Sequence, residues 1–119
     1  MTLVAEMELY DRYRLAEAQL AAGQAHEAAT TLAPAEGELP VQGLVLLARA
    51  YAGSAQLGRA RAVLLRVVDA DPVDDWARYA LGRVEEGLGD RAAAEEHYRV
   101  AIALRPRDEY RERLARLPV

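Results

Sequence analysis

The feature of this sequence that most constrains its fold is a long period marked by proline. Pro72 and Pro106 lie 34 residues apart in a chain of 119 residues. When the sequence is aligned on this spacing, small and bulky apolar residues fall into the same register in three successive segments. Self-similarity at a fixed period of this length predicts a fold built from three copies of one supersecondary unit.

The residues in register alternate between small and bulky side chains. Each copy has a leucine followed by a small residue: Leu15-Ala16, Leu47-Ala48 and Leu81-Gly82. Each copy then has an alanine with a bulky residue four positions later: Ala28 and Leu32, Ala60 and Leu64, and Ala94 and Tyr98. Small residues let two helices cross closely, and bulky residues fill the space beside the crossing. The register therefore predicts pairs of packed helices.

Apolar residues recur every three or four positions along almost the whole chain, which is the period of an amphipathic helix. Gly and Pro interrupt this pattern at intervals. We expect helices near residues 4–22, 25–33, 42–53, 56–70, 74–87, 91–104 and 107–116. The segment LAPAEGELP contains Pro34, Gly37 and Pro40, so we expect the second helix to stop near Ala33 and a loop to follow.

The two ends of the chain are expected to cover the apolar faces of the terminal helix pairs. Residues 107–117 place Tyr110, Leu114 and Leu117 on one helical stripe, with Arg and Glu around them. This pattern predicts a capping helix with a polar outer face. At the other end, we expect the first helix to be extended, and its outer side covered, by Leu3, Val4 and Met7.

This register resembles that of the tetratricopeptide repeat family over about residues 9–107. The resemblance implies an all-α fold: a right-handed superhelical solenoid of antiparallel helix pairs with about seven helices. It also implies one domain over residues 1–119, with repeats at about 9–40, 41–74 and 75–108 and a capping helix at 107–117. The third repeat departs from the family at Arg78 and Glu85, where tryptophan and tyrosine are frequent.

The resemblance also implies a binding surface, because in this family the first helix of each pair lines the concave side of the solenoid. Transferring the register to this sequence gives a candidate peptide-binding groove made of Tyr10, Tyr13, Glu17, Val45, Arg49, Trp76, Tyr79 and Arg83. Tyr, Trp and Arg are enriched at interface hot spots. Arg49 and Arg83 are suited to hold an acidic side chain or a carboxylate terminus.

Each of these side chains also has a purely structural interpretation. Trp76 shares a helical stripe with apolar residues, so a core position is equally compatible with the pattern. Tyr10 and Tyr13 are compatible with packing against the N-terminal extension. Arg49 and Arg83 are compatible with solvated or ion-paired positions.

The function that this reading favours is a non-catalytic protein- or peptide-binding adaptor or scaffold, whose partner is a protein or peptide of unknown identity. The alternatives are a self-associating structural module, such as a homodimer, and a regulatory subunit of a larger complex. Self-association would use the apolar surface that the irregular first repeat leaves uncovered. Two copies of this surface would pair across a two-fold axis. The residues expected in that surface are Leu3, Val4, Met7 and Leu39.

An enzyme is not expected. The chain has no cysteine and one serine, Ser54, while His26 and His97 fall in different repeats. A catalytic nucleophile and its base must lie within hydrogen-bond reach, and no such pair is evident. We expect no catalytic residues, no metal and no cofactor, because no glycine-rich phosphate loop is present and Asp74 and Asp75 are placed to cap a helix.

The net charge and the hydropathy of the sequence argue against two further classes of partner, nucleic acids and membranes. The formal net charge is −4, whereas nucleic-acid binding requires a surplus of basic residues. No apolar stretch approaches the roughly 20 residues that span a bilayer, and the N-terminal residues do not form a signal-peptide pattern. We therefore expect no nucleic acid, no membrane association and a cytoplasmic location.

Overall fold

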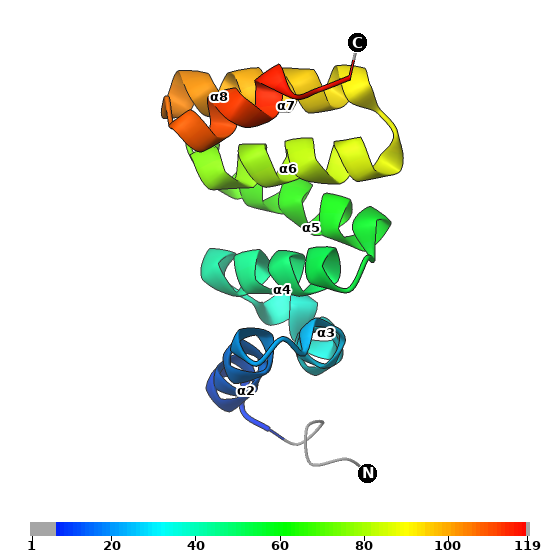
Figure 1. The fold of residues 1–119 in the computed structure, drawn as a ribbon. Helices are drawn as coiled ribbons and strands as arrows, with labels where there is room; N and C mark the ends of the chain where they lie inside the picture. The colour runs from blue at the N-terminus through cyan, green and yellow to red at the C-terminus, as the bar shows by residue number, and fades with distance from the viewer. Residues whose placement is uncertain (1–6, 119) are drawn as a thin grey trace. The chain divides into compact units, whose positions relative to one another are not determined.

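The structure is a computed structural model that describes residues 7–118. Within this range the chain forms seven α-helices, one 3-10 helix and no strand, which confirms the predicted all-α class. The helices are α2 (Leu9–Ala21), α3 (Ala25–Leu32), the 3-10 helix η1 (Ala33–Glu38), α4 (Val41–Gly53), α5 (Leu57–Ala70), α6 (Asp75–Leu88), α7 (Arg91–Leu104) and α8 (Asp108–Ala115) (Figure 1). None of the described helices is long and apolar enough to cross a bilayer.

The chain divides into two compact units, which we call the N-terminal unit (Met1–Val63) and the C-terminal unit (Leu64–Val119). In the N-terminal unit, α3 packs against both α2 and α4. The predicted small residues Ala16, Ala28 and Ala48 are buried in this unit, beside the bulky Leu32 and Leu47. The helix pairing expected from the register is therefore present.

The three turns inside the helix pairs share one hydrogen-bonding pattern. The backbone N–H groups of Gln24, Gln56 and Asp90 donate to carbonyl oxygens five residues earlier, at distances of 2.8 to 2.9 Å. This bond is characteristic of the Schellman motif, in which the preceding residue has a positive φ. Gly23 and Gly89 fill that position in two turns, whereas Ala55 fills it in the third with a φ of +59°. The repeat is thus visible in the backbone of the turns.

The segment after α3 differs from the prediction. The helix ends at Leu32, close to the expected position, but a 3-10 helix follows in place of the expected loop. Pro34 lies in the first turn of this helix, where a missing N–H costs nothing. Leu39 beyond it is buried against Gly43, since a Cβ added to Gly43 would lie 3.1 Å from the Leu39 Cβ. Burial of the apolar Ala35 and Leu39 therefore accounts for the regular structure of this segment.

The N-terminal end of the first helix also differs. Met7 lies in a bend and α2 begins at Leu9, so the prediction that Met7 continues the helix is wrong. Glu8 has the extended backbone of an N-cap residue, and its carbonyl accepts the first helical hydrogen bond, from the N–H of Arg12 at 2.9 Å. Leu3 and Val4, the other residues of that prediction, lie outside the described residues.

The C-terminal unit contains α6 and α7 as a packed pair, with α8 lying against α7. Asp74 and Asp90 cap the two helices of the pair, since their carboxylates accept hydrogen bonds at 3.0 Å from the N–H groups of Ala77 and Ala93. Gly82 is needed at the crossing of the pair, because a Cβ there would overlap the ring of Tyr98. This contact matches the small-and-bulky pattern of the sequence.

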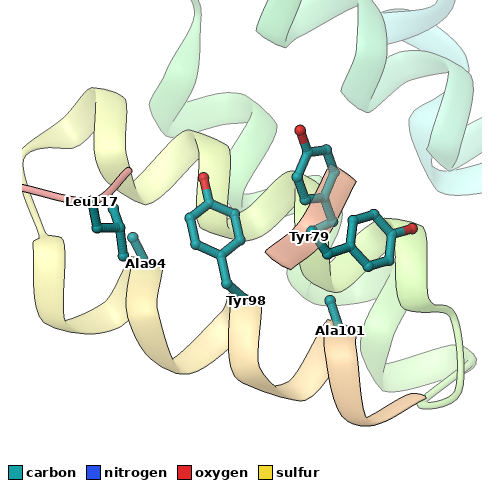
Figure 2. Close-up of a cluster of buried hydrophobic side chains, with 6 residues drawn as sticks. Tyr79, Ala94, Tyr98, Ala101 and Leu117 are labelled. Atoms are coloured by element: carbon teal, nitrogen blue, oxygen red, sulfur yellow. The ribbon is translucent and has the colours of Figure 1, made fainter. Parts of the chain in front are cut away.

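The predicted C-terminal helix is present as α8, and it completes the core of this unit. Tyr110 and Leu117 are buried together with the α6 and α7 side chains Tyr79, Ala94, Tyr98 and Ala101 (Figure 2). The rings of Tyr79 and Tyr110 are stacked, with centroids 4.7 Å apart. An aromatic cluster is therefore the centre of the C-terminal unit.

Candidate functional site

In the N-terminal unit, three of the predicted groove residues lie on α2, outside the face formed by its two buried residues. Arg12 and Ala16 form the buried face, and Arg12 donates a hydrogen bond of 2.7 Å to the carbonyl of Thr31 on α3. Tyr10 and Glu17 are exposed and Tyr13 is half-buried. The spacing of three and four residues on one helix places the three predicted side chains on a common face.

Tyr10 contacts a neighbouring arginine, Arg14, on the same helix. Its side chain is 61% exposed, and the guanidinium of Arg14 donates a hydrogen bond of 3.0 Å to its hydroxyl. The same guanidinium lies 5.8 Å from the centre of the Tyr10 ring, within the range of a cation–π contact. Arg14 was not among the predicted groove residues, although its i,i+4 spacing from Tyr10 is a signal that could have indicated the pair.

The two predicted residues of α4 differ in accessibility. Most of α4 is buried, including Leu44, Leu46 and Leu47, because it packs against α3 and contacts α2 and η1. Arg49 is one of the few exposed side chains of this helix, and Val45 is half-buried. The positions predicted to face a ligand are thus among those that the packing of α4 leaves accessible.

In the C-terminal unit, the three predicted residues of α6 have three different environments. Arg83 is exposed and Trp76 is half-buried. Tyr79 is only 7% exposed, because its ring packs on Tyr110 and lies 5.7 Å from the ring of Tyr98. Arg83 donates a hydrogen bond of 3.3 Å to the Tyr79 hydroxyl. Tyr79 is therefore a core residue, and only Trp76 and Arg83 offer side-chain surface.

Two carboxylates of α6 hold α8 in place, and sequence reasoning did not identify them as partners of this helix. The hydroxyl of Tyr110 donates a hydrogen bond of 2.6 Å to Asp75, which also pairs with Arg107 at 3.5 Å and with Arg105 at 3.9 Å. Asp75 therefore anchors α8, while Asp74 alone caps α6. Near the other end of α6, Glu86 accepts hydrogen bonds from Arg113, at 3.0 Å, and from the hydroxyl of Tyr98.

Burial raises the pKa values of the two tyrosines in this network, Tyr98 and Tyr110. Desolvation raises the pKa of Tyr98 well above its ordinary value, and the hydrogen bond to Glu86 raises it further. Desolvation likewise raises the pKa of Tyr110, followed by the hydrogen bond to Asp75. Both phenols are consequently protonated at neutral pH and act as hydrogen-bond donors, which gives them a structural role.

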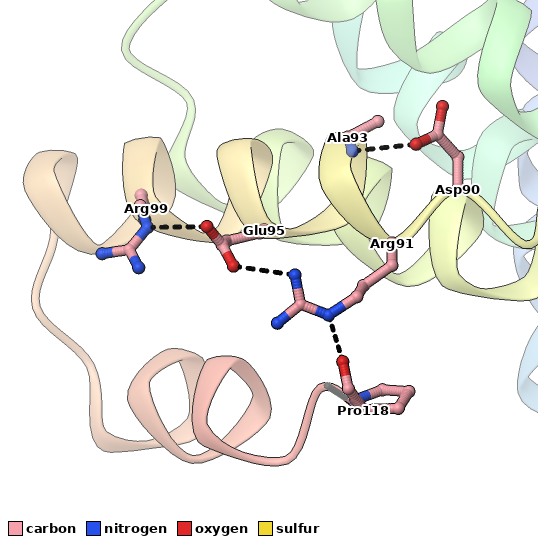
Figure 3. Close-up of polar contacts among 6 residues, drawn as sticks. All are labelled: Asp90, Arg91, Ala93, Glu95, Arg99 and Pro118. Carbon is pink, nitrogen blue, oxygen red and sulfur yellow. Dashed lines mark hydrogen bonds and ion pairs between the residues drawn. The ribbon is translucent and has the colours of Figure 1, made fainter.

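The exposed side of α7 carries a row of charged contacts. Arg91 and Arg99 both pair with Glu95, at 3.0 and 3.5 Å, and Arg91 also donates to the backbone carbonyl of Pro118 (Figure 3). Exposed pairs of this kind contribute little to stability. The contact between Arg91 and Pro118 shows that Pro118 lies beside α7. Across residues 7–118, no three His, Asp or Glu side chains gather where they could hold a metal ion.

Comparison with known proteins identifies the class of this fold. Residues 77–108 match the family model of the tetratricopeptide repeat, which is the third of the three predicted repeats. No curated protein matches the sequence. The resemblance to tetratricopeptide repeats that the prolines and small residues indicated is thus confirmed.

Two similar solved structures extend the likeness to most of the chain. One is the Yersinia enterocolitica type III secretion chaperone SycD in complex with a peptide of the translocator YopD, with 18% identity and a TM-score of 0.76. The match covers 92% of this chain and 86% of that one. The other is PcrH in complex with the chaperone-binding region of PopB, with 16% identity, a TM-score of 0.75 and coverage of 94% and 95%. The chain therefore has a tetratricopeptide-like helical fold.

Proposed function

We propose that this chain is a non-catalytic adaptor that binds a segment of another polypeptide in the cytoplasm. The observation that supports this function most is the near-complete match, in both directions, to two chaperones that were each solved with a polypeptide segment of a partner. A domain of about this size with exposed aromatic and arginine side chains is suited to that role, because these side chains dominate interface energies.

The proposed contacts are the accessible members of the predicted groove. They are Tyr10, Tyr13, Glu17, Val45 and Arg49 in the N-terminal unit, and Trp76 and Arg83 in the C-terminal unit. Arg14 is added to this set because it is bound to the exposed Tyr10 hydroxyl. Tyr79 is left out because its ring is buried under Tyr110. Arg49 and Arg83 each supply a positive charge that would hold an acidic group of the partner.

The test is an affinity pull-down from lysate of the source organism, read by mass spectrometry. The intact chain is compared with the double variant Arg49→Ala/Arg83→Ala and with Arg99→Ala/Arg111→Ala, which removes two exposed arginines outside the proposed groove. We expect a polypeptide that is retained by the intact chain and by the control variant and is lost by the groove variant.

Two results would contradict parts of this proposal. A partner retained by all three proteins would support an adaptor but place its contacts outside the proposed residues. Recovery of the bait chain alone, repeated with chemical cross-linking, would contradict the adaptor function. That second result would favour self-association, the alternative that the sequence leaves open.

A further inference from the structure

A cavity of about 340 Å³ lies in the N-terminal unit, between α3 and the turn that joins α4 to α5. Its lining includes His26, Ala29 and Ala33 on one side, and Tyr51, Gln56 and Arg59 on the other. None of the proposed groove residues lines it. Two helical positions separate neighbours by about 200°, so Tyr51 projects from a different side of α4 than Arg49 does. The cavity is therefore distinct from the proposed groove.

The cation of this cavity, Arg59, stands at the end of a chain of hydrogen bonds. The Ser54 hydroxyl donates to the carbonyl of Ala50 at 2.8 Å, and the amide of Gln56 donates to the same hydroxyl oxygen at 2.8 Å. Arg59 then donates from Nη1 to Oε1 of Gln56 at 2.6 Å. A guanidinium carries five N–H donors, so this bond leaves donors for a ligand while it restrains the side chain.

The rest of the lining combines the apolar Ala29 and Ala33 with Tyr51 and with the exposed, polar His26 and Thr30. Tyr51 is 6% exposed, and Ala29 and Ala33 line the cavity with it. Burial raises the pKa of the Tyr51 phenol, the charge of Glu36 raises it further and that of Arg59 lowers it. The phenol is thus a neutral donor at neutral pH, and both a cation and a carboxylate act on it.

We propose that this cavity binds a carboxylate-bearing ligand, with Arg59 as the charged donor and the alanine and tyrosine walls against the apolar part of the ligand. A planar guanidinium pairs with a planar carboxylate through two parallel hydrogen bonds. The positive charge of Arg59 balances one negative charge. A singly charged carboxylate therefore fits better than a doubly charged phosphate.

The test is a ¹H–¹⁵N NMR titration of the full chain with three probes: butyrate, a blocked tripeptide containing one glutamate, and inorganic phosphate. We expect butyrate, the blocked peptide or both to give saturable shifts confined to amides near Ala29, Tyr51 and Arg59. The butyrate and peptide arms distinguish a free organic acid from an acidic side chain. Arg59→Gln should raise the dissociation constant about tenfold or more, because a charge-assisted pair is lost.

Two further variants keep the result interpretable. Arg111→Gln removes another exposed arginine, in the C-terminal unit, and should leave binding unchanged. Arg59→Lys keeps the charge but not the planar fork and should bind more weakly than the intact chain. Shifts that do not saturate, that persist in Arg59→Gln, or that are matched by phosphate at equal affinity would overturn the proposal. Because the cavity and the groove share no residues, either proposal can fail without the other.

Discussion

Ala55 adopts a left-handed backbone conformation in a turn where the equivalent positions of the other two helix pairs are glycine. A Cβ makes this conformation unfavourable, whereas glycine adopts it freely. Ala55→Gly should therefore stabilise the chain by about 0.5–1 kcal/mol after allowing for the greater freedom of glycine in the unfolded state. Urea unfolding followed by circular dichroism measures the change.

The matched control for this change is Gly23→Ala in the first turn. Its φ is +80° and an added Cβ would meet nothing within 4 Å, so only the backbone conformation is tested. This variant should lose about 1 kcal/mol. If both variants left the urea midpoint unchanged, the turns would not have the conformations described for them.

Gly82 tests the close crossing of α6 and α7. A side chain at this position would overlap the buried ring of Tyr98, and inserting atoms into a packed core costs about 1–3 kcal/mol. We expect Gly82→Ala to lower the thermal midpoint measured by circular dichroism. Gly58→Ala, where an added Cβ would meet nothing within 4 Å, should cause no loss. Equal midpoints for the two variants would contradict the crossing.

At the scale of elements, α8 is held by phenols that must stay protonated. The pKa values of Tyr98 and Tyr110 lie above the ordinary value of about 10, so folding favours their protonated forms. The stability that they contribute is complete below pH 10 and is lost as the pH rises above it. Urea midpoints should therefore begin to fall as the pH rises above 10 and should still be falling at pH 11, because the folded-state pKa values lie well above 10.

Single tyrosine variants separate this effect from general alkaline denaturation. Tyr110→Phe removes the hydrogen bond to Asp75, so it should cost about 1 kcal/mol at neutral pH and flatten the alkaline fall. Tyr10→Phe, at an exposed position, should keep the full alkaline fall. If Tyr110→Phe showed the same pH dependence as the intact chain, α8 would not be held by this phenol.

At the scale of the whole molecule, the oligomeric state decides between the adaptor and the self-associating module. Leu39, one of the residues expected in an apolar dimer surface, is buried against Gly43. Among residues 7–118, the large apolar side chains that are exposed come from different segments: Tyr10, Leu65, Val73, Leu88 and Leu104. Scattered exposed residues of this kind are normal for a monomer.

We therefore expect light scattering at high protein concentration to give the monomer mass of 13.1 kDa. A stable dimer would support the homodimer alternative and would require an apolar contact surface beyond these single residues. Dilution would then distinguish a specific dimer, which dissociates at a defined concentration, from non-specific association.

The sequence by itself determined the positions of most α-helices, although not the start of α2 or the presence of η1. The helices from α3 to α8 begin and end within one residue of the predicted bounds, because period, proline and glycine act locally. The small residues at the crossings were also predictable, since a register shared by three repeats identifies them. The presence of α8 followed from the apolar stripe of Tyr110, Leu114 and Leu117.

The tertiary structure decided which of these faces are covered. Periodicity shows that Tyr79 and Arg83 share a side of α6, but only the position of Tyr110 shows that Tyr79 is buried while Arg83 is exposed. Residues from several elements likewise determine whether η1 forms, whether Leu39 is buried and where the cavity beside Arg59 lies. A helix pattern determines which side chains point together, whereas burial depends on the element that packs against them.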